Sequence, residues 1–408
     1  MRSSYKRLGD YIREVDVRNL NEDVNTLLGI NIDKYYMPSV ANVVGTDLSR
    51  YKIVKKGQFA CNRMHVGRDK RLPVALSTND ESFIVSPAYD VFEITNTQIL
   101  LSEYLMMWFS RTEFDRITWF YTDADVRGGL SWKTFLDLQF SVPSPEKQRE
   151  IVAEYNAAQK RIDLNNQLIQ KLEETAQIIY KHWFVDFEFP DENGKPYKSN
   201  GGEMVESELG EIPKGWKVGK VGSVVKCNPN TLSDKDTFES ILYLDTGNIF
   251  NNKINELQEL CIETDEIPSR ARRKVQEMDI IFSTVRPNLK HYGIIKNQPE
   301  NLVVSTGFAV LQVNQKEILP ELIYSFLTDD KTVKDLQAKA EMSVSTYPSI
   351  TADDILDIDF IIPNNALQNM IRPIFRSKNH FVSMKNNENK KSEELLSVLL
   401  SKLSTIEV

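Results

Sequence analysis

The second half of this chain repeats the first half, and this duplication constrains the fold more than any other feature. Leu130-Ser131 recurs as Ile350-Thr351, about 220 residues later, and Phe83-Ile84-Val85-Ser86 recurs as Leu302-Val303-Val304-Ser305. Each copy runs into a long segment with helical periodicity. The sequence therefore predicts two similar globular parts, each followed by a long helix, an order suited to holding two binding surfaces at a fixed separation.

Length and composition agree with a soluble protein of two domains. The 408 residues are 41% hydrophobic and 26% charged. No apolar run reaches the roughly 18 residues of a membrane span, and the N-terminus lacks the apolar stretch of a signal peptide. Cys61, Cys227 and Cys261 lie far apart without a Cys-x-x-Cys pair. This sparse set favours a reducing cytoplasm over a disulfide frame or a zinc ribbon.

The net charge of −8 is unusual for a protein that binds nucleic acid, because phosphate contacts normally require an excess of cations. The charge is unevenly distributed, however. Residues 1–148 contain 19 Lys and Arg against 19 Asp and Glu, so this part is neutral. Local basic clusters are therefore more informative than the total.

A long helix is expected to begin at Pro145, because Ser144 is a suitable N-cap and Glu146 stands in the first turn. At about 35–40 residues it would be roughly 55 Å long. Asn165 in its seam either fixes the register of a helix pair or is a solvated amide. The seam alternates in steps of four and three, as in a coiled coil: Ile151, Tyr155, Ala158, Ile162, Asn165, Ile169, Leu172, Ala176, Ile179 and Trp183.

The second long segment has a similar seam with apolar ends and a polar middle. We therefore expect the two helices to pair mainly at their ends and to leave surface for other proteins. Its members are Ile371, Phe375, Lys378, Val382, Lys385, Asn389, Ser392, Leu396, Leu399, Leu403 and Ile406.

Before each long segment, short strands alternate with helical stretches. Strands are expected at 83–85, 91–94, 138–142, 241–244, 248–250 and 279–283, and helices at 99–118 and 318–328. The segment 188–203, rich in Pro, Gly and Asn, indicates a connector between the two halves.

The sequence contains none of the common catalytic signatures. It has no P-loop, and no Gly-x-Gly run follows a predicted strand. The four histidines are scattered without metal-ligand spacing. Asn228-Pro229-Asn230 approaches an adenine-methylating Asn-Pro-Pro-aromatic motif but indicates a turn. These observations favour a binding protein over an enzyme.

Basic and polar residues that are suited to DNA cluster in both halves. Binding DNA requires cations for phosphates and forked or amide side chains for base edges. The candidates in the first half are Arg63, His65, Arg68, Lys70, Arg71, Arg127 and Lys133. Those in the second half are Arg270, Arg272, Arg273, Lys274, Arg286, Asn288, Lys290, His291, Ser345 and Tyr347. For any one cation the alternative is a solvated surface residue, and for Tyr347 it is packing against Pro348.

Several motifs resemble those of the specificity subunit of type I restriction-modification systems, in the order of that family and over nearly the whole chain. The second helical region has Gln368 where the first has Gln148, but no equivalents of Pro145 and Glu146. The similar stretches are 143–152, 171–176 and 183–187 for the first conserved helical region, 208–218 for the entry into the second target-recognition domain, and 282–287, 305–310 and 347–350 within that domain.

The resemblance implies an α/β (α+β) fold of two target-recognition domains, each followed by a long helix. The implied boundaries are 1–143 and 208–363 for these domains, 144–187 and 364–408 for the long conserved helices, and 188–207 for the linker. The two helices would pack as an antiparallel coiled coil.

The resemblance also implies a non-catalytic DNA-reading subunit of a multisubunit DNA adenine N6-methyltransferase and ATP-dependent restriction endonuclease. Each domain would read one half of a bipartite, asymmetric target, with the helices as a ruler. Two modification subunits and two restriction subunits would bind S-adenosylmethionine, ATP and Mg, so this chain would carry no cofactor. The alternatives are a duplicated adaptor that binds proteins, and a fused methyltransferase or nuclease with an unseen motif.

Overall fold

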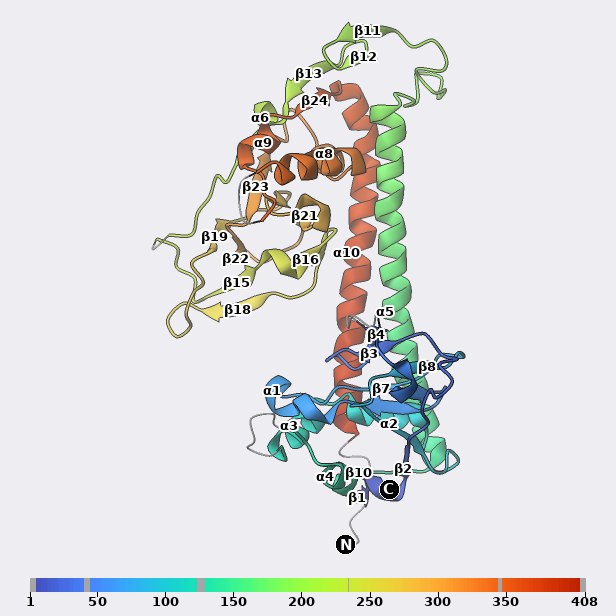
Figure 1. Cartoon of the computed structure of the whole chain (residues 1–408). Coiled ribbons are helices and arrows are strands. Elements are labelled where there is room, and N and C mark those ends of the chain that lie inside the picture. Colours follow the sequence, from blue (N-terminus) through green and yellow to red (C-terminus); the bar gives the residue numbers. More distant parts are fainter. Residues whose placement is uncertain (1–4, 40–44, 123–128, 234, 344–346, 404–408) are drawn as a thin grey trace. The chain divides into compact units, whose positions relative to one another are not determined.

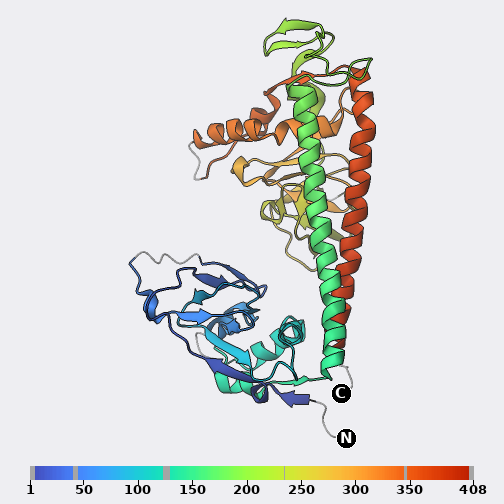
Figure 2. The same cartoon turned by 90° about the vertical axis from the view of Figure 1, so that its right-hand side faces the viewer.

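The computed structural model describes residues 5–39, 45–122, 129–233, 235–343 and 347–403, without the side chain of His65. The chain forms two compact units, residues 1–165 with 387–408 and residues 166–386. Each unit joins a globular head to parts of the long helices α5 (Pro145–Tyr180) and α10 (Asn365–Lys402), as Figures 1 and 2 show. The mixed fold class expected from the sequence is confirmed. The domain boundaries stay predictions.

The first head, residues 5–143, is built around a four-stranded antiparallel sheet in the order β2-β9-β6-β7. These strands are β2 (Ile12–Val15), β9 (Asp90–Ile94), β6 (Phe59–Cys61) and β7 (Val74–Leu76). Two-stranded pairs complete it: β1 (Tyr5–Arg7) with β10 (Gln139–Ser141), β3 (Leu28–Ile30) with β4 (Tyr36–Pro38), and β5 (Lys52–Val54) with β8 (Phe83–Val85). Its helices are α1 (Val66–Asp69), α2 (Ser102–Phe109), α3 (Thr112–Phe120) and α4 (Trp132–Asp137).

The single helix expected over 99–118 is wrong, because the chain forms α2 and α3 with a break between them. Arg111 adopts an extended backbone (φ −75°, ψ 144°), and the Ser110 hydroxyl donates to the carbonyl of Met106. The bend lets Phe109 and Phe114 both enter the core, with ring centroids 5.0 Å apart. Burial of two aromatic rings outweighs the lost helical hydrogen bonds.

The second head, residues 208–363, has the same arrangement. Its main sheet is β14 (Val225–Cys227), β23 (Phe308–Val313), β20 (Ile280–Ser283) and β21 (Tyr292–Ile294), in that order. A second sheet contains β18 (Gln258–Cys261), β15 (Ser240–Leu244), β22 (Leu302–Ser305) and β19 (Ala271–Lys274). Further pairs are β13 (Lys217–Lys220) with β24 (Asp359–Ile362), and β16 (Ile249–Phe250) with β17 (Lys253–Ile254). The hairpin of β11 (Met204–Ser207) and β12 (Gly210–Pro213) precedes them and begins within the expected linker 188–207. The helices are α6 (Val221–Val224), α7 (Pro320–Leu327), α8 (Asp330–Glu341) and α9 (Ala352–Leu356).

Alternate residues of the main sheet in the second head enter different cores. Ile280 and Phe282 pack with α7, α8 and the long helices, whereas Ile281 between them packs with β15 and β22. In the first head, Phe59 packs with the helices and Ala60 with the strand pair on the other side. This two-residue period is what a sheet buried on both faces requires. Each head is therefore a layer of helices on a sheet, with further strands behind it.

One buried glutamine at the start of each long helix ties that helix to its head. The Gln148 amide donates to the carbonyls of Ile99 and Pro143 and accepts from the backbone N–H of Leu101, at 2.8 Å each. Gln368 repeats this pattern with Glu317, Pro363 and Leu319, at 3.0 to 3.1 Å. The two side chains are 0% and 3% exposed. The cap is also repeated, because Asn364 accepts from Leu367 as Ser144 accepts from Lys147.

We expect Gln148→Leu to lower the free energy of unfolding by about 2–3 kcal/mol, because it removes the partner of one buried and two part-buried backbone groups. Gln368→Leu should have a similar effect. Chemical denaturation of the full chain measures both changes. Gln170→Leu on the exposed face of α5 is the matched control and should change stability by less than about 0.5 kcal/mol. Equal effects of the three substitutions would contradict this role.

The two long helices pair in antiparallel fashion within each unit. Ala158 and Ile162 pack with Leu396 in the first unit, and Tyr180 shares a core with Ile371 and Phe375 in the second. The seam expected for α10 is buried or partly buried at every described position. Ile406 lies outside the described residues. At the end of α5 and in the π-helical turn Lys181–Val185 that follows it, the buried positions move by one residue, from Ile179 and Trp183 to Tyr180 and Phe184. A helix of 3.6 residues per turn drifts in this direction against a seven-residue repeat, and the wider π-helical turn changes the face further.

The prediction that the helices pair mainly at their ends is wrong, because polar seam residues bind one another. The Asn165 amide, 4% exposed, donates to Asn389 at 2.9 Å and to Glu388 at 3.2 Å. The ammonium of Lys378 lies 2.6 Å from the Glu173 carboxylate. Asn165 therefore fits a register-setting role better than a solvated one.

The connector after α5 is folded against the second head. Phe187, just before the connector, and Phe189 within it are buried, with ring centroids 5.6 Å and 5.4 Å from that of Trp216. Trp216 follows a turn that uses Gly215 at φ +83°. An aromatic cluster thus joins the start of the connector to the second head.

Candidate nucleic-acid interface

The segment joining the third and fourth strands of each main sheet occupies the same place in both heads. In the first head the carbonyl of Arg63 accepts from Leu130, and in the second the carbonyl of Thr284 accepts from Ile350. The basic segment 63–71 therefore corresponds to 284–291. Residues 270–274 form β19, whose counterpart is β5, because each pairs antiparallel with the corresponding strand β22 or β8. The two clusters 63–71 and 270–274 therefore do not occupy equivalent places in the two heads.

The three described candidate arginines of the first head are all paired with carboxylates. Arg63 binds Asp90 at 2.7 Å and lies over the Trp132 ring, so it braces the sheet. Arg68 binds its neighbour Asp69 at 2.6 Å. Arg71 lies 2.8 Å from Asp33 and 3.5 Å from Asp115.

Lys70 is held differently from these arginines. Its backbone is left-handed, at φ +55°, and its ammonium lies 5.1 Å from the centre of the exposed Trp119 ring. Lys133 is exposed on α4, the His65 side chain is not described, and Arg127 lies outside the described residues. Among the described candidate cations of this head, Lys70 is thus the one that lies over an exposed aromatic ring, since the Trp132 ring beneath Arg63 is partly buried.

Trp119 was not among the sequence-based candidates. The signal was available, since Trp119, Phe120 and Tyr121 follow one another. Successive residues of a helix point about 100° apart, so three such rings cannot share one buried face. All three are exposed, by 44%, 80% and 53%.

The second head also has a cation on an aromatic ring, formed by Arg286 and Tyr347, although these residues are not the repeat equivalents of Lys70 and Trp119. Arg286 is left-handed (φ 48°, ψ 70°), and its N–H donates to the carbonyl of Pro348 at 2.9 Å. The guanidinium lies 5.1 Å from the Tyr347 ring centre. Both side chains are exposed. The Arg286 guanidinium is therefore exposed, held on a ring and attached to a fixed turn. Such a group can bind a base edge or a phosphate through two hydrogen bonds.

The neighbours of Arg286 are partly engaged. Lys290, also left-handed, lies 3.3 Å from Asp330, and the N–H of Asn288 donates to Gln337. Burial lowers the pKa of His291, which favours its neutral form. Ser345 lies outside the described residues.

The cluster on β19 is divided between surface and interior. Arg270 and Arg272 are exposed, whereas the Lys274 ammonium binds Asp236 at 2.5 Å. Arg273 is half-buried, burial lowers its pKa, and its Nη1 atom has no hydrogen-bond partner among the described residues. Arg270 and Arg272 are therefore the accessible cations of this strand.

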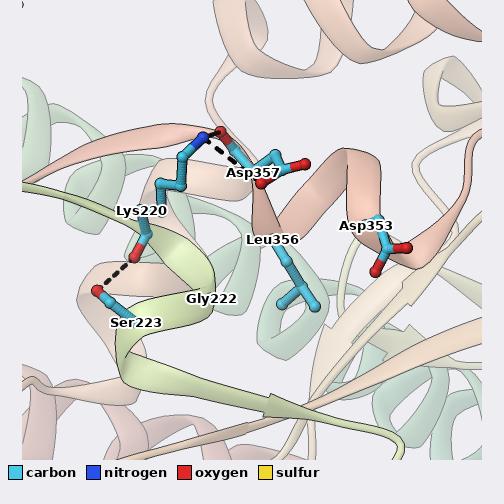
Figure 3. A pocket seen from close by; sticks show the side chains of 6 residues that line it. All are labelled: Lys220, Gly222, Ser223, Asp353, Leu356 and Asp357. Atoms are coloured by element: carbon cyan, nitrogen blue, oxygen red, sulfur yellow. Dashed lines mark hydrogen bonds and ion pairs between the residues drawn. The ribbon is translucent and has the colours of Figure 1, made fainter.

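The described surface offers no arrangement typical of catalysis. One hollow of about 460 Å³ is lined by α6 and α9, and Figure 3 shows Lys220 reaching Asp357 while Asp353 points away from that pair. Lys220 and Asp357 are exposed to solvent, which suits a surface contact. Within the described ranges, no group of three His, Cys, Asp or Glu residues is placed to hold a metal ion, and no helix is long and apolar enough to cross a membrane.

Each of the two duplicated heads therefore carries a cation on an exposed aromatic ring. Residues 213–395 match the family described as the type I restriction modification DNA specificity domain. The solved structure of the type I restriction-modification system S subunit from M. genitalium has the same fold. It is 12% identical with a TM-score of 0.52, and the match covers 99% of this chain and 96% of that one.

Two curated relatives are specificity subunits. The chain is 26% identical over 184 residues to the type I restriction enzyme HindI specificity subunit of Haemophilus influenzae, covering 45% of this chain and 39% of that protein. It is 24% identical over 271 residues to the MjaIX specificity subunit of Methanocaldococcus jannaschii, covering 62% and 58%. The chain thus matches less than two thirds of either relative's length. The resemblance indicated by the motifs is confirmed: this chain is similar to type I restriction-modification specificity subunits.

Proposed function

We propose that this chain is the DNA-reading specificity subunit of a type I restriction-modification complex. The match of residues 213–395 to a DNA specificity domain carries the proposal. The head of each copy then reads one half of a bipartite target. Because the two heads share a frame but differ in their basic and aromatic side chains, the half-sites are unlike and the target is asymmetric.

The arrangement of the cations supports this reading. Lys70 and Arg286 lie in corresponding segments of the two heads, and each lies over an aromatic ring. Arg270 and Arg272 add exposed positive charge to the second head. Phosphate contacts position such a protein and forked side chains select bases.

The long helices also offer surface for partner subunits. Each carries exposed apolar residues that immediately precede seam residues, so a second stripe runs beside the seam. Its members are Leu164, Leu168 and Ile178 on α5, and Met370, Ile374, Phe381, Met384, Leu395 and Val398 on α10. An amphipathic helix of a partner fits such a stripe. We assign it to two modification subunits, which would bind S-adenosylmethionine and methylate adenine. Two restriction subunits using ATP and Mg would join them on cytoplasmic DNA.

Mapping of methylated adenines tests the proposed function. A host strain lacking other methyltransferases is given this chain together with its modification subunit, and its genome is sequenced for N6-methyladenine. We expect a two-part sequence with a fixed gap. Modification without any sequence preference, or a complex that fails to shift DNA in electrophoresis, would favour a protein-binding adaptor. Labelled S-adenosylmethionine bound by the chain alone would favour a fused enzyme.

The ruler role predicts that a longer helix pair lengthens the unread gap. Seven residues are inserted into α5 between Asn165 and Glu173 and into α10 between Lys378 and Asn389, so that the seam stays in phase. Seven residues add about 10 Å, or roughly three base pairs. We expect unchanged half-sites with a gap longer by about three base pairs in the methylation map. An unchanged gap in the modified sequence would contradict the ruler.

A further inference from the structure

The two most exposed large apolar side chains among the described residues occupy the same place in the two heads. Phe120, 80% exposed, is the last residue of α3, and Met342, 84% exposed, directly follows α8. Helices α3 and α8 correspond in the repeat, since each follows the first helix after the main sheet. Full burial of a Phe or Met side chain would contribute about 1.5–3 kcal/mol, so leaving both exposed at corresponding helix ends indicates a contact made on binding.

Phe120 directly follows the ring of the first head's cation–aromatic pair, and Met342 directly follows the helix against which the Arg286 segment of the second head packs. Trp119, whose ring lies under the Lys70 ammonium, directly precedes Phe120. The ring centroids of Phe120 and Tyr121 lie 5.3 Å apart. In the second head, the segment containing Arg286 packs along α8 through the bond from Asn288 to Gln337. Arg116 adds an exposed cation to α3. Exposed apolar side chains near cations, here called the apolar tips Phe120 and Met342, are complementary to a ligand in which phosphates flank stacked rings.

The first tip is held rigidly from beneath. On the buried side of α3, Phe114 and Thr118 are 2% and 0% exposed, and Asp115 binds the buried ammonium of Lys34 at 2.8 Å. Asp115 also accepts from the N–H of Leu72, in the segment that follows Lys70. The tip and the neighbouring cation are thus fixed to one buried ion pair. A side chain that is to separate two stacked bases needs such support, because a mobile side chain would be displaced by the bases.

From these features we infer that Phe120 and Met342 are wedges that enter the base stack, one in each half-site. The inference rests on the proposed function and deepens it: each head opens a base step as well as reading base edges. Proteins that deform DNA insert Phe, Met, Leu, Ile or Pro side chains between base pairs. Opening a step at both half-sites also lowers the cost of turning an adenine out of the duplex for methylation.

Permanganate footprinting, which detects unstacked thymines, tests the wedges in the assembled methyltransferase on a duplex with the mapped target. For the unaltered complex we expect reactive thymines in both half-sites. Phe120→Ala should remove or weaken the reactivity of one half-site only, and Met342→Ala that of the other. Each variant should bind the duplex about tenfold more weakly. Leu20→Ala is the matched control, because Leu20 is 76% exposed in the first head and has no part in the cation–aromatic pair.

Three results overturn the inference. One is an unchanged footprint and affinity in both variants, and another is an equal effect of Leu20→Ala. The third is loss of the modification subunit from the purified complex with an unaltered footprint in what remains, which would assign the tips to a protein contact. Failure of the unaltered complex to bind its target would instead contradict the proposed function, so the two failures are distinguishable.

Discussion

Replacing Arg286 with alanine is expected to weaken binding of the assembled complex to its target by about tenfold to hundredfold. A forked arginine on a guanine edge discriminates by about 1–3 kcal/mol. Arg286 is prepared for such a contact, because its backbone is fixed by Pro348 and its guanidinium lies on the Tyr347 ring. Fluorescence anisotropy with the mapped target, and with variants of the second half-site, measures the effect.

A comparison of substitutions separates base reading from a phosphate contact. Arg286→Lys keeps the charge without the fork, so it should leave the loss in place if Arg286 reads a base and largely restore affinity if it binds a phosphate. Lys214→Ala is the matched control, because Lys214 forms an exposed pair with Glu203 at 2.9 Å on the β11–β12 hairpin. Equal affinities of Arg286→Ala and Lys214→Ala would contradict the assignment.

The backbone of Arg286 adds a stability test to the binding test. A left-handed conformation costs a non-glycine residue about 1–3 kcal/mol. Arg286→Gly should therefore leave the second head as stable as before or more stable while it loses affinity. A gain in stability together with a loss of affinity is typical of a residue whose strained backbone is retained for function.

Lys378→Met is expected to lower the free energy of unfolding by about 3–5 kcal/mol, because it leaves the Glu173 carboxylate buried without its cation. The two side chains are 10% and 19% exposed and lie 2.6 Å apart between the long helices. Glu173 also accepts from Asn252, whose side-chain oxygen accepts in turn from Ile294. Loss of the pair therefore disturbs the contact between helix and head as well as the helix pair.

The double substitution Glu173→Leu with Lys378→Met should recover most of this loss, since no buried charge remains. Chemical denaturation of the full chain measures the four stabilities of the cycle. The control is Lys171→Ala, which breaks an exposed pair with Glu174 (side chains 74% and 44% exposed) and should cost less than about 1 kcal/mol. A cost for Lys378→Met no greater than that of the control would contradict the role of the pair.

The neighbouring Lys296 belongs to the same polar contact. Burial, and next the nearby Lys378, lower its pKa to about 8, and its amine binds Asn379 at 2.7 Å. A lysine with a lowered pKa favours the folded state more as the pH rises through 8 towards the ordinary value of 10.5. The contact between the second head and α10 thus contains Lys378, whose charge is paired with Glu173, and Lys296, whose charged form is disfavoured by burial.

Local periodicity made a large part of the architecture predictable. The duplication, the start of α5 and the seam of α10 depend on residues close in sequence, and each is present in the structure. The equivalence of Gln148 and Gln368 was visible as a spacing, although its cause, three bonds to each head, was not. The break between α2 and α3 was missed because aromatic packing overrode a continuous helical pattern.

By itself, the sequence determined two copies of one head, each followed by a long helix, and a list of cations suited to DNA. Only the tertiary structure decided which cations are accessible. Arg63 binds Asp90, 27 residues away, while Arg286 lies on a ring supplied by Tyr347. It also decided that polar seam residues pair, since Lys378 meets Glu173 across 205 positions. Periodicity and capping are short-range effects that a sequence displays directly. The partner of a charge depends instead on long-range folding, which brings distant residues within a few ångströms.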